Sequence, residues 1–106
     1  MSGKVYKLNS VQRAKLHLAA VFANNFTNYM YTVAYNIVEK ENVPFDLLLP
    51  LIQETTNKLQ GQNPAKSQTG PAVRRDAITV KKHEELLKKN SQYLAVYKLL
   101  TKSIQS

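Results

Sequence analysis

A run from Ser10 to Lys40 contains neither glycine nor proline, and this feature constrains the fold more than any other. Because nothing in the run breaks a helix, and Asn9 or Ser10 can cap its start, the sequence predicts one continuous helix. Such a helix would be about 45 Å long, which exceeds the width of a domain of 106 residues. A helix of that length is expected to be a central spine or an interface element.

The middle of this run, Leu16 to Val38, has no Asp, Glu, Lys or Arg over 23 residues, which is long enough to cross a bilayer. It also contains His17 and four asparagines. Amide and imidazole groups are costly to place in hydrocarbon without internal partners. The segment therefore favours a helix that protein buries on most sides over a membrane span.

Two faces emerge when the residues of this helix are placed about 100° apart. One broad apolar face predicts a core contact and comprises Leu16, Ala19, Phe22, Ala23, Phe26, Met30, Val33, Ala34 and Ile37. An uncharged polar stripe lies opposite and comprises His17, Asn24, Asn28 and Tyr35, with Val21 and Tyr31 beside it. A solvent-facing stripe normally carries Lys and Glu. This stripe either packs inside the same domain or meets a second domain, a subunit or a ligand.

Shorter helices are predicted after the long one. Pro50 lies inside a predicted helix over 45–59, so this helix is kinked or starts later. The polar stretch 61–76 is a long connector, with a short helix over 64–67 and a turn at Thr69–Pro71. Asp76 or Thr79 is expected to cap a helix that ends near Lys89, and Ser91 to cap a last helix that ends near Ile104. The predicted fold class is all-α, with one long central helix and three or four shorter helices packed around it.

Charge and composition exclude several kinds of site. There is no cysteine, which rules out disulfides, zinc–thiolate sites and a cysteine nucleophile. His17 and His83 are the only histidines and neither belongs to a metal-binding motif, so no metal site is expected. No glycine-rich phosphate loop is present, so no cofactor is expected to bind this chain. The net charge of +8 keeps an alternative open, a stand-alone basic helical module that binds an anionic or protein partner. Nucleic acid is not expected, because no recognition helix is identifiable.

Three motifs in order resemble one known family. They are HLAAVFANNFTNYM over 17–30, PFDLLLPLI over 44–52, and QTGPA over 68–72 followed by Arg74 and Asp76. This combination resembles the C-terminal all-helical domain of unknown function that follows the Rossmann domain in proteins grouped as NAD(P)-dependent oxidoreductases. Those proteins are similar to pyrroline carboxylate reductases and hydroxyacid dehydrogenases. The resemblance covers residues 5–104.

The resemblance implies a division of the chain and a role for it. Residues 1–9 are expected to be a lead-in from a missing N-terminal domain, and residues 10–106 a single helical domain. The chain alone is not expected to catalyse, whereas its parent protein would be a cytoplasmic oxidoreductase that uses NAD(P). The implied partners are the N-terminal Rossmann domain and a second copy in a homodimer. The contact between the two copies is expected on the uncharged polar stripe, and the shorter helices are expected to cover the apolar face.

The same resemblance gives candidate site residues. His17 would act as an acid or base, and Arg74 could hold a substrate carboxylate through its planar guanidinium group. A pairing of Arg74 with Asp76 or with Glu side chains is the alternative. The remaining residues expected at the substrate cleft or an interface are Asn24, Asn28, Tyr31, Gln68 and Thr69.

Overall fold

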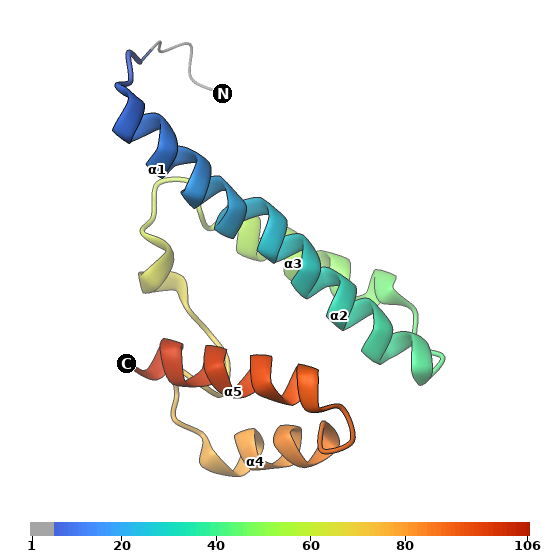
Figure 1. Ribbon diagram of the computed structural model, residues 1–106. Helices are drawn as coiled ribbons and strands as arrows, with labels where there is room; N and C mark the ends of the chain where they lie inside the picture. The colour runs from blue at the N-terminus through green and yellow to red at the C-terminus, as the bar shows by residue number, and fades with distance from the viewer. Residues whose placement is uncertain (1–5) are drawn as a thin grey trace. The chain divides into compact units, whose positions relative to one another are not determined.

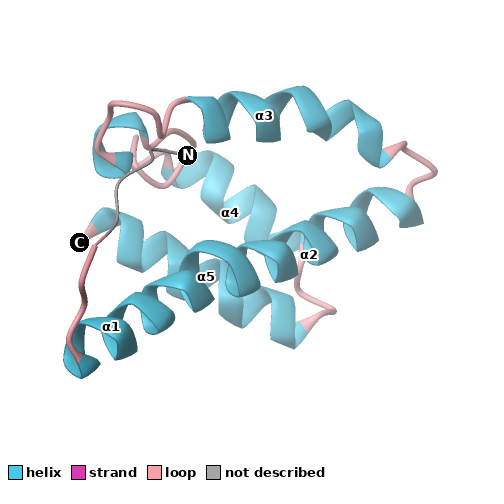
Figure 2. Cartoon of the chain, turned by 90° about the horizontal axis from the view of Figure 1, so that it is seen from above, coloured by secondary structure: helices cyan, strands magenta, loops and turns pink. Residues whose placement is uncertain are grey.

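The computed structural model describes residues 6–106, all of whose regular secondary structure is helical (Figures 1 and 2). The predicted all-α class and the long helix are therefore confirmed. The chain divides into two compact units, residues 1–47 and 48–106. Val5, part of the expected lead-in, lies outside the described residues. None of the helices within 6–106 is both long and apolar enough to cross a membrane.

The first unit is dominated by the long helix, which runs without a break from Ser10 to Lys40. It comprises α1 (Ser10–Ala20), a π-helical segment η1 (Val21–Phe26) and α2 (Thr27–Lys40). Asn9 caps the start, because its side chain accepts from the Gln12 amide at 2.8 Å and its amide donates to the Gln12 side chain at 3.0 Å. After the helix ends, the Tyr35 ring packs against Phe45 with ring centroids 5.7 Å apart.

The π-helical segment is the feature that sequence periodicity did not predict. Its wider turn is visible at Thr27, whose hydroxyl donates to the carbonyl of Phe22, five residues earlier, at 3.1 Å. A single π turn places one extra residue in the helix. It therefore rotates everything after Phe26 by about 100° relative to a regular α-helix.

The shorter helices follow the long one, and the division between the two units falls within the first of them. The predicted helix over 45–59 is divided into a 3₁₀ turn, η2 (Phe45–Leu48), and α3 (Leu49–Asn57). Pro50 lies in the first turn of α3, where backbone amides have no partner within the helix, so the proline breaks no hydrogen bond. The prediction that this helix starts later than residue 45 is therefore confirmed. The short helix predicted over 64–67 is present as a 3₁₀ turn, η3 (Pro64–Ser67).

A helical hairpin completes the second unit. It consists of α4 (Ala77–Leu86) and α5 (Ser91–Gln105), which lie side by side in Figure 1. Asp76 caps α4 as expected, whereas α4 ends at Leu86 rather than near Lys89. The cap of α5 is Asn90 rather than Ser91, because the Asn90 side chain accepts from the Tyr93 amide at 3.0 Å.

Ala72 is the one buried residue in the described part, with 8% of its surface exposed. It lies in the turn that joins η3 to α4. Most other apolar side chains are half-buried or exposed. A surface of this kind is typical of a domain that completes its core against other protein.

Candidate functional site

The long helix holds four of the predicted site residues, and the π turn changes their alignment. Asn24 and Asn28 stay on one line, with Tyr31 beside them. His17 lies before the extra residue, so it leaves this line by about a quarter of a turn. The predicted stripe of His17, Asn24, Asn28 and Tyr35 is therefore corrected by the removal of the histidine, and its two asparagines are named the asparagine stripe here. Asn24, Asn28 and His17 are exposed, and Tyr31 is half-buried.

The π turn also brings the apolar residues of the long helix closer to one line. Leu18, Phe22, Phe26 and Met30 recur at every fourth residue. In a regular α-helix, side chains with this spacing would turn around the helix axis by about 120° from Leu18 to Met30. The extra residue of the π turn removes about 100° of this rotation. Leu18 thus joins the face in place of Leu16. The apolar stripe, as we name it here, comprises Val11, Leu18, Phe22, Phe26, Met30 and Ile37.

The apolar stripe is largely open to solvent, although the sequence predicted a core. Leu18, Phe22 and Phe26 are 53%, 62% and 51% exposed. The Phe22 and Phe26 rings meet edge to face, with centroids 5.0 Å apart, near the middle of the helix. Exposed apolar surfaces of this kind are typical of a contact with other protein.

The other three predicted site residues lie in the second unit, on the connector between α3 and α4. Gln68 and Thr69 line a hollow of about 410 Å³ against α3, bordered by Leu51, Thr55 and Leu59. Arg74 is exposed, and its guanidinium group lies 4.0 Å from the Asp76 carboxylate. The alternative pairing of Arg74 with Asp76 is thus observed, at the outer limit of an ion pair.

Asp76 is held mainly by Thr79. The Thr79 hydroxyl donates to the Asp76 carboxylate at 2.7 Å and the Thr79 amide donates at 3.1 Å. These two bonds, with a smaller effect from the charge of Arg74, keep the pKa of Asp76 below its ordinary value. Because Thr79 provides most of the stabilisation, Asp76 does not depend on Arg74, and the guanidinium group keeps donors for another anion.

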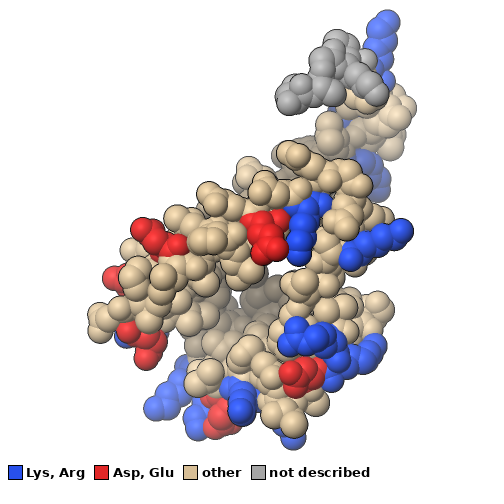
Figure 3. All heavy atoms as spheres, turned by 180° about the vertical axis from the view of Figure 1, so that it is seen from behind, with Lys and Arg blue, Asp and Glu red and all other residues tan. Residues whose placement is uncertain are grey.

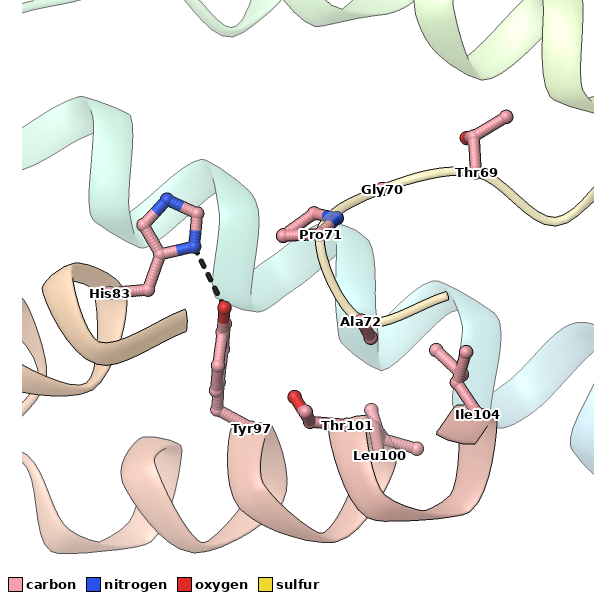
Figure 4. Close-up of a pocket in the computed structure, with 9 residues that line it drawn as sticks. All are labelled: Thr69, Gly70, Pro71, Ala72, His83, Tyr97, Leu100, Thr101 and Ile104. Carbon is pink, nitrogen blue, oxygen red and sulfur yellow. Dashed lines mark hydrogen bonds between the residues drawn. The ribbon is translucent and has the colours of Figure 1, made fainter. Parts of the chain in front are cut away.

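A second hollow, of about 310 Å³, lies between the connector and the helical hairpin (Figure 4). The loop Thr69–Ala72 forms one wall, His83 of α4 contributes one edge, and four residues of α5 form the other wall. These are Tyr97, Leu100, Thr101 and Ile104. No Lys, Arg, Asp or Glu is among its lining residues, so this pocket suits an uncharged group.

A hydrogen bond between His83 and Tyr97 forms the polar end of this pocket. The His83 Nδ1 and the Tyr97 hydroxyl oxygen are 2.8 Å apart, and the two rings meet edge to face (Figure 4). Burial, and secondarily the negative charge of Glu84, raise the pKa of Tyr97 above its ordinary value. Tyr97 therefore remains a neutral phenol at physiological pH.

Sequence reasoning did not find this pair, although a signal was present. Asn90 lies at the tip of the hairpin, and His83 and Tyr97 are each seven residues from it. Two helices joined by a tight connection fold back on each other, so positions at equal distance from the tip can face one another.

Charged side chains on the hairpin are mixed in sign. A shallow hollow is lined by Lys81, Lys88 and Lys98 together with Glu84 and Glu85. Lys88 and Glu85 form an ion pair at 2.7 Å. Figure 3 shows acidic atoms next to basic atoms at several places on the visible face. No group of His, Asp or Glu within residues 6–106 is arranged to hold a metal ion.

Comparison with known proteins agrees with the resemblance seen in the motifs. Residues 1–104 match the family described as a domain of unknown function, DUF2520. The chain belongs to the DUF2520 family. This DUF2520 domain is similar to a crystal structure titled "putative NADP oxidoreductase", from Bacteroides fragilis, with 45% sequence identity and a TM-score of 0.92. The match covers 97% of this chain and 40% of that chain, so the DUF2520 domain spans less than half the length of this relative. No curated protein matches it.

The raised pKa of Tyr97 can be tested by titration of the DUF2520 domain. We expect Tyr97, followed by NMR of its ring carbons, to ionise above the ordinary phenol value of about 10. Glu84→Gln should lower this pKa, because it removes the second cause, and Glu85→Gln should leave it unchanged. Since the folded-state pKa is raised, the stability that Tyr97 adds is present below about pH 10 and is lost as pH rises through the folded-state value. Ionisation of Tyr97 below the ordinary value would contradict this account of its surroundings.

Proposed function

We propose that this chain is the C-terminal helical domain of an NAD(P)-dependent oxidoreductase and is not catalytic alone. The observation that carries this proposal is the match to a relative titled as an NADP oxidoreductase. It covers nearly all of this chain but only 40% of the relative. The remainder of such a protein would hold the nicotinamide nucleotide, and a Rossmann domain preceding this one is the expected partner. NAD(P) would thus be the cofactor of the parent protein.

Within such an enzyme, this domain would supply walls of the substrate cleft. The asparagine stripe, with Tyr31 beside it, offers uncharged donors and acceptors that fix a substrate without the desolvation cost of a full charge. Gln68 and Thr69 provide similar groups on the connector. An exposed ion pair at 4.0 Å is weak, so Arg74 can exchange Asp76 for a substrate carboxylate.

His17 remains the candidate acid or base, because imidazole is the side chain best suited to proton transfer near neutral pH. It is exposed on α1 and lies off the asparagine stripe. Its proposed role is therefore at the edge of the cleft. The alternative function, a stand-alone basic module, is supported by the net charge of +8. Glu84 and Glu85 of α4 lie among the basic side chains of the helical hairpin, and this mixing favours the oxidoreductase domain.

The first test joins the domain to its expected partner. We expect no measurable NADPH binding by this chain in calorimetry, because it has no glycine-rich turn that could hold a pyrophosphate. The same chain, expressed in one polypeptide with the nucleotide-binding half of its parent protein, should bind NADPH. Micromolar binding by the chain alone, or no binding by the joined protein, would contradict the proposal.

We further propose that the apolar stripe forms a homodimer contact. A two-fold axis lets one surface serve both copies. The stripe fits such an axis, because the Phe22–Phe26 pair lies near the middle of the helix. Two antiparallel copies that cross there would each bury equal lengths of the stripe. The second copy is therefore the occupant that this surface fits best.

Sedimentation of paired variants tests which face makes this contact. We expect the wild-type chain to sediment as a dimer at tens of micromolar. Phe22→Lys should weaken the dimer by about tenfold or more, because it buries an unpaired charge. Asn28→Lys, the matched change on the asparagine stripe, should leave the dimer intact. A 12.0 kDa species for the wild-type chain would contradict the dimer, and loss of the dimer in Asn28→Lys alone would move the contact to the other face.

A further inference from the structure

The pocket between the Thr69–Ala72 loop and α5 has one polar end and an otherwise apolar lining. Pro71, Leu100 and Ile104 provide apolar walls, and the hydroxyls of Tyr97 and Thr101 lie on the side of α5 that faces the loop (Figure 4). Its volume, about 310 Å³, lies at the small end of the range for ligand pockets. A pocket of this size accepts a small molecule with an apolar body and one polar group.

The hydrogen bond between Tyr97 and His83 favours a polar group that can both donate and accept, such as a hydroxyl. A phenol oxygen has one proton to donate and lone pairs to accept, and His83 uses one of these positions. If the His83 Nδ1 accepts from Tyr97, the phenol oxygen can still accept from a ligand hydroxyl. If the Nδ1 donates, the phenol proton is free for a ligand oxygen. An alcohol satisfies both arrangements, whereas a carbonyl satisfies only the second.

Charge restricts the ligand further. No lysine or arginine lines the pocket, so a carboxylate would find no permanent cation among the lining residues. Arg74, the candidate for a carboxylate, is not among the lining residues and lies beside Asp76 instead. The pocket therefore selects against hydroxy acids and in favour of uncharged alcohols.

We propose that this pocket is a binding site for a small, uncharged, apolar alcohol, whose hydroxyl bonds to Tyr97 while its body contacts Pro71, Leu100 and Ile104. This inference rests on the proposed oxidoreductase function and assigns a substrate class to it. Nicotinamide-dependent enzymes interconvert alcohols and carbonyl compounds, so an alcohol in this pocket would be one of the two reactants. His83 is a positioning residue in this site, because it holds the Tyr97 hydroxyl at the pocket edge.

Cyclohexanol is a suitable probe, and the whole 106-residue chain, isotopically labelled, is titrated without any nucleotide. We expect saturable NMR shifts confined to the Thr69–Ala72 loop and the second half of α5. Cyclohexanecarboxylate, of the same ring size, should bind at least about tenfold more weakly, because its charge is unpaired. Shifts that do not saturate, that lie elsewhere, or that are equal for the carboxylate would overturn the proposal.

Tyr97→Phe keeps the ring and removes the hydroxyl, so it should weaken cyclohexanol binding by about three- to tenfold. Tyr93→Phe, on the same helix but outside the pocket lining, should bind like the wild type. If Tyr97→Phe unfolds, Thr101→Val provides the second measurement and should weaken binding by about two- to threefold. Wild-type affinity in the folded variant would overturn the proposal.

Because no cofactor is present in this titration, its outcome is independent of NADPH binding by the joined protein. If the joined protein binds NADPH but cyclohexanol does not bind in the pocket, this inference is wrong and the proposed function still holds. Saturable binding at the pocket, with no NADPH binding by the joined protein, would remove the proposed function and keep the alcohol site.

Discussion

The direction in which each side chain points around the long helix is the constraint on which the rest of the structure depends. Apolar residues at every fourth position drift by about 40° per step around a regular α-helix, and the π turn at Val21–Phe26 offsets most of this drift. One extra residue thus brings Val11 and Leu18 onto the face of Phe22, Phe26 and Met30. The same residue separates His17 from the asparagines, so the division of the helix into contact faces follows from one local departure in geometry.

We propose separate roles for the asparagine stripe and the apolar stripe. Uncharged amides give direction to a contact, and aromatic and aliphatic side chains give it area. We assign the first to the substrate cleft and the second to a second copy of the chain. The helical hairpin contributes differently, since its His83–Tyr97 bond places one neutral hydroxyl at the edge of an apolar pocket.

Much of the fold could be predicted from the sequence because its signals are local. The absence of Gly and Pro between Ser10 and Lys40, the Asn9 cap and the Pro50 position each act within one or two turns. The π turn was not predicted, because a fixed angle per residue assumes regular geometry. Its signal was the four-residue spacing of Leu18, Phe22, Phe26 and Met30. The His83–Tyr97 pair was missed because its partners come from different helices.

The most direct test is the sedimentation of a chain with one alanine inserted after Phe26. Every residue of the apolar stripe remains in this variant, but the added residue rotates the two halves of the stripe apart by about 100°. Circular dichroism should show the helix retained, and insertion of one alanine after Gln62 in the connector provides the control. We predict that the insertion after Phe26 loses the dimer at a concentration where the control keeps it. A dimer of undiminished strength in the chain with the insertion after Phe26 would contradict the proposed contact.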